Sequence, residues 1–519
     1  MTVPCTLTVE MTAEAFLVDQ DGNFLVDENG DNLTAAGWQD VTADVMTSQA
    51  PTWTQGNNGN SLFDRVGNVG SFVFVLNNAS SNSAGLVGYY SPDHNNRETF
   101  FGLDAKVRVT VSEGVNDHEE WYGKIVKIEP IPGQYGERKT QITCEDWMSF
   151  AYTDNIRGIT VQLDKRDDEI LETLIALASE APLDTDFSTG DDTYSYALHD
   201  ETSDTSSLAR VFQKLAMSGM GRINLMNWGV LTYRPRSGSL IETEPQAILT
   251  DSMLSMSASR NKANRVKNVT VSTFPVQRDT SPAVLWTAQR ELSISAGDTK
   301  IFDVYLRDPS GRATRVAALS LETPIANTDY KFSSVSGSGS DLNANLGISY
   351  ELKADIVTVS LTNNAGATGY LWVHQIQGTG LYLYEPVAAT GDTGQPDGQN
   401  LVIDMVYQDD PSVGEDIAGL VTSWYAADQT DVDAVTFNAN RDQDHMDAAF
   451  LVPGDLVQIN ETQTGIGRNY FINGTSKTMT VYNVLMVTWY LVQANQISSA
   501  WFLEVPGFSE LDSTTILGA

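Results

Sequence analysis

The same order of strands and turns occurs twice in this chain, over residues 102–147 and again over residues 453–492. Each segment reads as a turn, an alternating strand, an aromatic strand that contains a glycine, a short turn and a strand that carries threonine. Alternation with a period of two puts every second side chain on one face of a sheet, so both segments predict an antiparallel meander. Their sequence identity is low, and chance similarity between two unrelated meanders is the competing explanation.

A true repeat would place two similar β-domains at the ends of the chain. Three copies would then present six similar domains in a ring, so that a threefold object matches a sixfold one. Between these ends, apolar residues recur at helical spacing over residues 168–178 and 206–218, and a hairpin is expected to turn at residues 227–229. A third helix is expected from Ser412, with Glu415 completing a capping box.

The length of 519 residues predicts three or four domains. Short strands separated by turn clusters suggest a β-sandwich after residue 268. We therefore predict a mainly β, multidomain fold with α+β elements. The expected divisions are an N-terminal tube-like β-barrel domain (1–155), a small α+β domain (156–267), a β-sandwich (268–398) and a second tube-like β-barrel domain with one helix (399–519).

The charge balance is strongly acidic, with 67 Asp and Glu against 31 Lys and Arg, a formal net charge of −36. This argues against stable binding to DNA or to anionic lipid, because phosphate contacts need clustered basic side chains. The one basic stretch, residues 260–267, is short, and a solvated loop or strand edge is the favoured interpretation. Solubility accounts for the acidity most simply; a sharper hypothesis is a surface past which a polyanion slides without sticking.

Only two cysteines are present, Cys5 and Cys144, which is too few for a disulfide framework. A pair between them is conceivable, but two reduced, buried thiols are the favoured prediction. No apolar run approaches the ~20 residues of a membrane span. The first residues lack the basic and apolar regions of a signal peptide, so synthesis in a cytoplasm without general secretion is expected.

No motif for catalysis, cofactor binding or metal binding is found, so we predict no catalytic, cofactor-binding or metal-binding residue, no cofactor and no enzyme activity. A phosphate-binding loop, an HExxH zinc motif and a GxSxG nucleophile elbow are all missing. The Asp-rich loops that begin at Asp19 and Asp27 lack the glycine and the glutamate of a calcium loop. The histidines are isolated in sequence: His94, His118, His199, His374 and His445.

Several segments, taken in order, resemble the N-terminal domain of minor tail and baseplate hub proteins of tailed bacteriophages. They are Trp38 to Val45, Asp64 to Asn78, Tyr89 to Pro92, Phe101 to Val109, Trp121 to Ile125 and Cys144 to Asp146. Residues 215–219 and 230–236 resemble the next domain of that family, and residues 501–515 resemble the C-terminus of such proteins. The resemblance covers most of the chain and is weakest over about 270–390.

This resemblance implies a homotrimeric hub at the tail tip of a virion, made in the bacterial cytoplasm. In such a hub, two tube-like domains per subunit form a pseudo-sixfold ring that continues the tail tube. Its partners would be the distal tail protein, the tail tube protein, the tape-measure protein and a tail fibre or spike. Genomic DNA would pass through the channel without sequence-specific binding, and no stable membrane association is expected. The family has no catalytic residues to carry over.

Two other functions remain open from the residues alone. Aromatic residues over 369–384, together with Trp489 and Tyr490, are typical of sheet packing but also suit sugar binding. A receptor- or carbohydrate-binding tail protein, with residues 268–398 as the binding module, is therefore the alternative. An enzyme that degrades surface glycans is a third hypothesis.

Overall fold

The computed structural model describes residues 3–16, 34–59, 61–99, 101–133, 137–156, 159–199, 206–241, 244–307, 316–428 and 430–494. Most of the Asp-rich loops after Asp19 and the whole of the C-terminal segment 501–515 lie outside these residues. The described chain is mainly β, as predicted, with six α-helices among 31 strands. None of the helices in these ranges is both long and apolar enough to cross a membrane.

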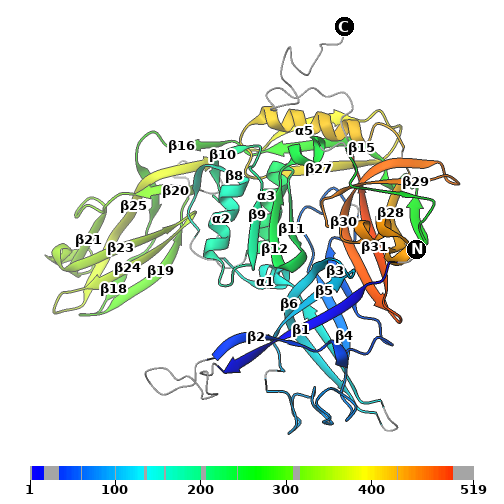
Figure 1. Ribbon diagram of the computed structural model, residues 1–519. Helices are drawn as coiled ribbons and strands as arrows, with labels where there is room; N and C mark the ends of the chain where they lie inside the picture. The colour runs from blue at the N-terminus through cyan, green and yellow to red at the C-terminus, as the bar shows by residue number, and fades with distance from the viewer. Residues whose placement is uncertain are drawn as a thin grey trace.

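The largest element is a 13-stranded sheet built from both ends of the chain (Figure 1). We call its first part the N-terminal unit: β1 (Thr6–Phe16), β2 (Thr34–Asp40), β3 (Thr52–Gly56), β4 (Ser71–Asn77), β5 (Lys106–Ser112), β6 (Asp117–Ile131) and β7 (Lys139–Glu145). We call the rest the C-terminal unit: β13 (Ala247–Thr250), β14 (Ser255–Ser259), β28 (Asp431–Asn438), β29 (Leu456–Glu461), β30 (Ile466–Thr480) and β31 (Val484–Gln493).

The strands of the two units follow one another without a break, in the order β14-β28-β31-β30-β3-β4-β7-β6-β5-β1-β2, while β29 and β13 branch from β30. This differs from the expected pair of separate barrels. Within the described residues the sheet is open, with β14 at one end and β2 at the other. One hydrophobic core also runs through both units, and its largest side chains include Trp53, Phe72, Trp121 and Trp489.

A small α+β region lies beside the shared sheet and contacts it at β3 and β6. It contains α1 (Trp147–Thr153), β8 (Gln162–Arg166), α2 (Asp167–Leu177), β9 (Asp184–Phe187), β10 (Thr193–Ala197), α3 (Leu208–Gly219), β11 (Arg222–Met226), β12 (Val230–Arg234) and α4 (Arg236–Ile241). The two helices predicted at 168–178 and 206–218 are therefore confirmed as α2 and α3, and the hairpin at residues 227–229 as β11 and β12. Strands β13 and β14 follow in the chain but join the shared sheet, although the predicted boundary at residue 267 groups them with the helices.

A two-layered β-sandwich projects to one side of the molecule in Figure 1. One layer contains β16 (Val276–Arg278), β17 (Ala283–Thr287), β18 (Leu292–Ile294), β20 (Val316–Leu321), β21 (Tyr330–Val335), β22 (Ser338–Asp341) and β25 (Gly369–Leu383). The other contains β19 (Thr299–Tyr305), β23 (Leu346–Lys353) and β24 (Ile356–Asn363). Buried side chains from both layers form a separate core, which agrees with the predicted sandwich.

The last region is a three-stranded sheet covered by one helix. Its elements are β15 (Val266–Thr273), β26 (Val387–Asp392), β27 (Gln399–Met405) and α5 (Pro411–Trp424). The helix is where the sequence predicts one, but the expected cap at Ser412 is wrong. Asp410 is the N-cap and accepts from the backbone N–H of Ser412, because Pro411 occupies the first helical position. The short helix α6 (Gln443–Ala449) precedes β29.

Candidate functional site: the junction of the two repeat units

The predicted repeat is real in strand order and in hydrogen bonding. In the N-terminal unit the order is β4-β7-β6-β5, and in the C-terminal unit it is β28-β31-β30-β29, with every pair antiparallel. The long central strands β6 and β30 each have 15 residues. The two matching segments therefore fold into meanders with the same strand order.

The correspondence extends to single hydrogen bonds. In β6 the register shifts after Ile125, and in β30 it shifts after Ile472. Ile125 donates its N–H to the carbonyl of Ala105 and accepts from the N–H of Asp104. Ile472 does the same with Asp455 and Gly454. A β-bulge inserts one extra residue at a defined position of a strand. The two bulges therefore align Ile125 with Ile472, and the units can be compared residue by residue.

Strand β3 joins the two units. It pairs with β4 through Thr52 and Trp53, and on its other edge residues 52–56 pair antiparallel with residues 474–478 of β30. The backbones meet closely at two glycines. A Cβ added to Gly56 would lie 2.5 Å from the carbonyl oxygen of Asn473, and one added to Gly474 would lie 2.3 Å from that of Asn57. Glycine inside a strand marks such close approach, so these residues fix the spacing at the junction.

A fully buried ion pair spans the junction. The ammonium of Lys477 on β30 lies 2.6 Å from the carboxylate of Glu120 on β6, and their side chains are 1% and 0% exposed. The indole N–H of Trp53 donates to the same Oε2 at 3.1 Å, and the side chain of Gln55 donates to the Glu120 carbonyl at 3.0 Å. Strand β3 thus supplies the groups that surround an ion pair whose members come from different units.

The opposite face of the shared sheet is half-exposed and carries a row of hydroxyl groups. Thr436 and Thr488 lie 2.9 Å apart, and Thr54 and Ser71 lie 3.0 Å apart. Ser476 is the cross-strand neighbour of both Thr488 and Thr54, so the row runs across the junction without a charged side chain. Beyond Ser71 the same row continues into Glu145 and Lys124, so the uncharged part of this face is limited to the junction itself.

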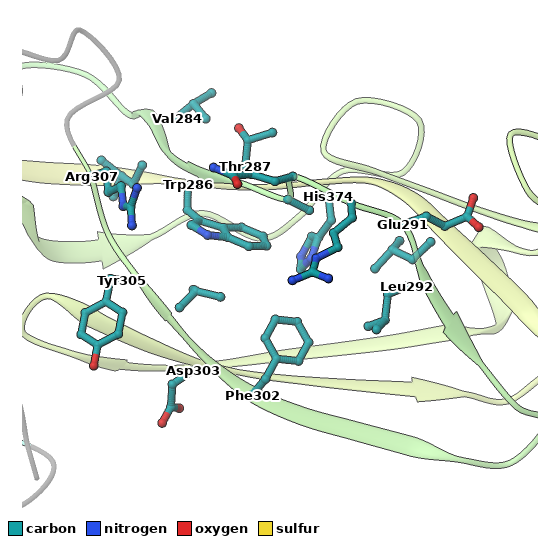
Figure 2. Close-up of a pocket in the computed structure, with 16 residues that line it drawn as sticks. Val284, Trp286, Thr287, Glu291, Leu292, Phe302, Asp303, Tyr305, Arg307 and His374 are labelled. Atoms are coloured by element: carbon teal, nitrogen blue, oxygen red, sulfur yellow. The ribbon is translucent and has the colours of Figure 1, made fainter.

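A second candidate site is a pocket of about 680 Å³ at an open edge of the sandwich, between β17 and β19. Its walls carry Trp286, Phe302 and Tyr305 together with the charged Asp303 and Arg307. Figure 2 shows the rings of Trp286 and Phe302 facing one another across the cavity. Such aromatic walls with a few charged groups are typical of small-molecule pockets.

His374 lines the back of this pocket but is a structural residue. Its ring centroid lies 5.4 Å from that of Trp286, and its Nε2 is 2.9 Å from the hydroxyl of Tyr350. Burial lowers the pKa of His374 to about 4, which keeps the imidazole neutral near pH 7. The prediction of a satisfied core histidine therefore holds.

Of the other histidines, His445 lies between two side chains: its Nδ1 is 2.5 Å from Oδ1 of Asp442, and its Nε2 is 2.8 Å from Oγ of Ser252. Both cysteines are free and buried, so the favoured prediction of two unpaired thiols is confirmed. The ring of His118 stacks on Phe450. Across the described ranges, no three His, Cys, Asp or Glu side chains are grouped as a metal site would need. In the basic stretch, Arg265 already pairs with Asp397 and Asp428.

Sequence reasoning missed the junction itself. The signals were present as Lys477, the single charged residue of the run 469–480, and as glycines within strands at Gly56 and Gly474. A lone lysine in a buried strand needs a carboxylate partner. Nothing in the sequence names Glu120 as that partner, because 357 residues separate the two.

Comparisons with known proteins find no matching protein-family model and no matching curated protein. Among solved structures, a tail protein from Neisseria meningitidis is 10% identical, with a TM-score of 0.46 over 94% of this chain and 96% of that chain. A prophage MuSo2 tail protein from Shewanella oneidensis is 8% identical, with a TM-score of 0.45 over 94% and 98%. The prophage tail protein gp18 from Listeria monocytogenes is 8% identical, with a TM-score of 0.41 over 95% of both chains. Each of these three structures is named a tail protein.

Proposed function

We propose that this chain is the hub of a phage tail tip, a structural protein whose copies form a ring that continues the tail tube. The observation that carries the proposal is the pairing of two repeat units side by side in one sheet. The contact is head-to-tail, because β3 of one unit meets the long strand of the other. Head-to-tail contacts generate rings when the rotation closes.

Three copies would supply six such units, which is how a threefold hub can match a sixfold tube. The hydroxyl row across the junction supports its role as the channel wall. Backbone phosphates bind where Lys and Arg cluster, whereas the hydroxyl row at the junction carries no charge and the whole chain carries −36. DNA would therefore pass without being retained.

The remaining surfaces would contact the rest of the tail. In this proposal the protein resides in the virion, is made in the bacterial cytoplasm, and binds the tube protein, the distal tail protein, the tape-measure protein and a fibre or spike. It performs no catalysis. Its contribution is a rigid connection, for which a continuous hydrogen-bonded sheet and a shared core are suited.

The number of subunits tests the ring. We expect light scattering on the purified protein, at several concentrations, to give a mass about three times the 56.6 kDa of one chain. A monomer that trimerises only on added tube protein would also agree. A stable dimer at all concentrations would contradict the hub, because two copies present four units, which cannot match a sixfold tube.

The pocket of the sandwich favours a second candidate function, the binding of a surface glycan. Changing Trp286 to alanine should weaken glycan binding at least about tenfold, since the indole forms one wall of the pocket. The matched control is Trp372→Ala, a 39% exposed indole on the same layer that does not line the pocket. Affinity measured on immobilised host envelope glycans checks this; equal binding by wild type and Trp286→Ala would contradict it.

A further inference from the structure

Two of the strand edges that lack a partner among the described residues of the shared sheet belong to β14 and β6. β14 pairs with β28 on one side only, and its serines are exposed. β6 leaves β5 after Lys124, so residues 126–131 pair only with β7. Val126 and Ile131 on this segment are exposed apolar side chains. An open edge with apolar side chains is a template for pairing with another chain.

Within one chain, the strands equivalent to these two open edges already pair with each other. Because the bulges align Ile125 with Ile472, residues 126–131 of β6 correspond to residues 473–478 of β30, the segment that β3 covers. β14 corresponds to β3, since each pairs antiparallel with the equivalent strand, β28 or β4. The open β14 edge and the open β6 edge are therefore the two halves of the same contact that β3 and β30 complete.

We propose that β14 of one copy pairs antiparallel with residues 126–131 of β6 in the next copy. This deepens the proposed function, on which it rests, by naming the surfaces through which copies join. The β3–β30 register transfers directly: Thr54 opposite Ser476 becomes Ser259 opposite Glu129, and Thr52 opposite Thr478 becomes Ser257 opposite Ile131. Each junction of the ring then repeats the same ladder.

The chemistry of the two edges is compatible with this pairing. The serines of β14 alternate as the threonines of β3 do, and Ser255 extends the hydroxyl row as the cross-strand neighbour of Thr436. Pro130 has no N–H to donate, so this ladder has at most one hydrogen bond fewer than its template.

Cysteine cross-linking tests the register. Ser259→Cys and Glu129→Cys are made as two single variants, mixed, and treated with a short bis-maleimide; Cys5 and Cys144 are buried and should not react. We expect a cross-linked dimer in the mixture and none with either variant alone. The matched control replaces Ser259→Cys by Ser349→Cys, an exposed serine on β23 at the edge of another sheet. A Thr54→Cys/Ser476→Cys chain should cross-link internally, which establishes that the reagent spans this geometry.

The double variant Ser259→Cys/Glu129→Cys separates this inference from the proposed function. We expect bands for one, two and three chains and none above, as in a closed ring of three. A trimer by light scattering without cross-links would overturn the strand pairing and leave the hub intact. A ladder beyond three chains would support the pairing and overturn the closed ring. A monomer that never cross-links, even with tube protein present, would overturn both.

Discussion

Replacing Lys477 with methionine should lower the free energy of unfolding by about 3–5 kcal/mol, because it leaves the Glu120 carboxylate buried without its counter-charge. The pair is fully buried, so water cannot take the place of the ammonium. The indole N–H of Trp53 remains, but one neutral donor does not offset a buried charge. Denaturant unfolding followed by tryptophan fluorescence measures the change.

Two further variants show whether the cost comes from the unpaired charge. Lys477→Met/Glu120→Gln removes both charges and should recover most of the lost stability, because a buried pair contributes little net free energy. Lys124→Met breaks a 2.6 Å pair with Glu180 whose side chains are 34% and 41% exposed, and should cost no more than about 1 kcal/mol. A double variant as unstable as the single one would contradict this account and assign the loss to packing.

The parts of the fold that were predictable are those encoded by local patterns. Helical spacing gives α2 and α3, and alternation gives β5 and the meander that contains it. The repeat was visible because both units keep the same turn, long strand and turn. Such elements are predictable because the spacing of apolar residues over a few positions shows which side chains face the core.

The sequence does not indicate which distant strands pair with one another in the shared sheet. β3 is five residues long and meets β30, more than 400 residues away, through backbone groups that every residue has. The same holds for β13 and β14, whose sequences do not say which sheet they join. The partner of Lys477 was equally hidden, because any of 67 acidic residues was available. Tertiary pairing between segments of ordinary composition leaves no local signal.

Raising the pH from about 4 to about 7 should cost the protein stability through one group, Asp167 at the start of α2. Burial raises the pKa of this carboxyl from its ordinary value near 4 to about 7, although the hydroxyl of Tyr194 donates to it at 2.8 Å. Between these values the folded state holds a proton that the unfolded state has released. Stability from this group is therefore present below pH 4 and is lost as pH rises through 7.

The loss of unfolding free energy follows from the pKa difference between the folded and unfolded states. At about 1.4 kcal/mol for each pKa unit, it is at most about 4 kcal/mol. Asp167→Asn keeps the shape and cannot ionise, so the variant should be more stable than wild type at pH 8 and should lose this part of the pH dependence. Glu172→Gln changes an exposed carboxylate on the same helix and should leave the pH profile as it is. Unfolding free energies of the three proteins from pH 4 to pH 8 decide the matter. Parallel curves for wild type and Asp167→Asn would mean that Asp167 ionises as easily in the folded protein as in the unfolded chain.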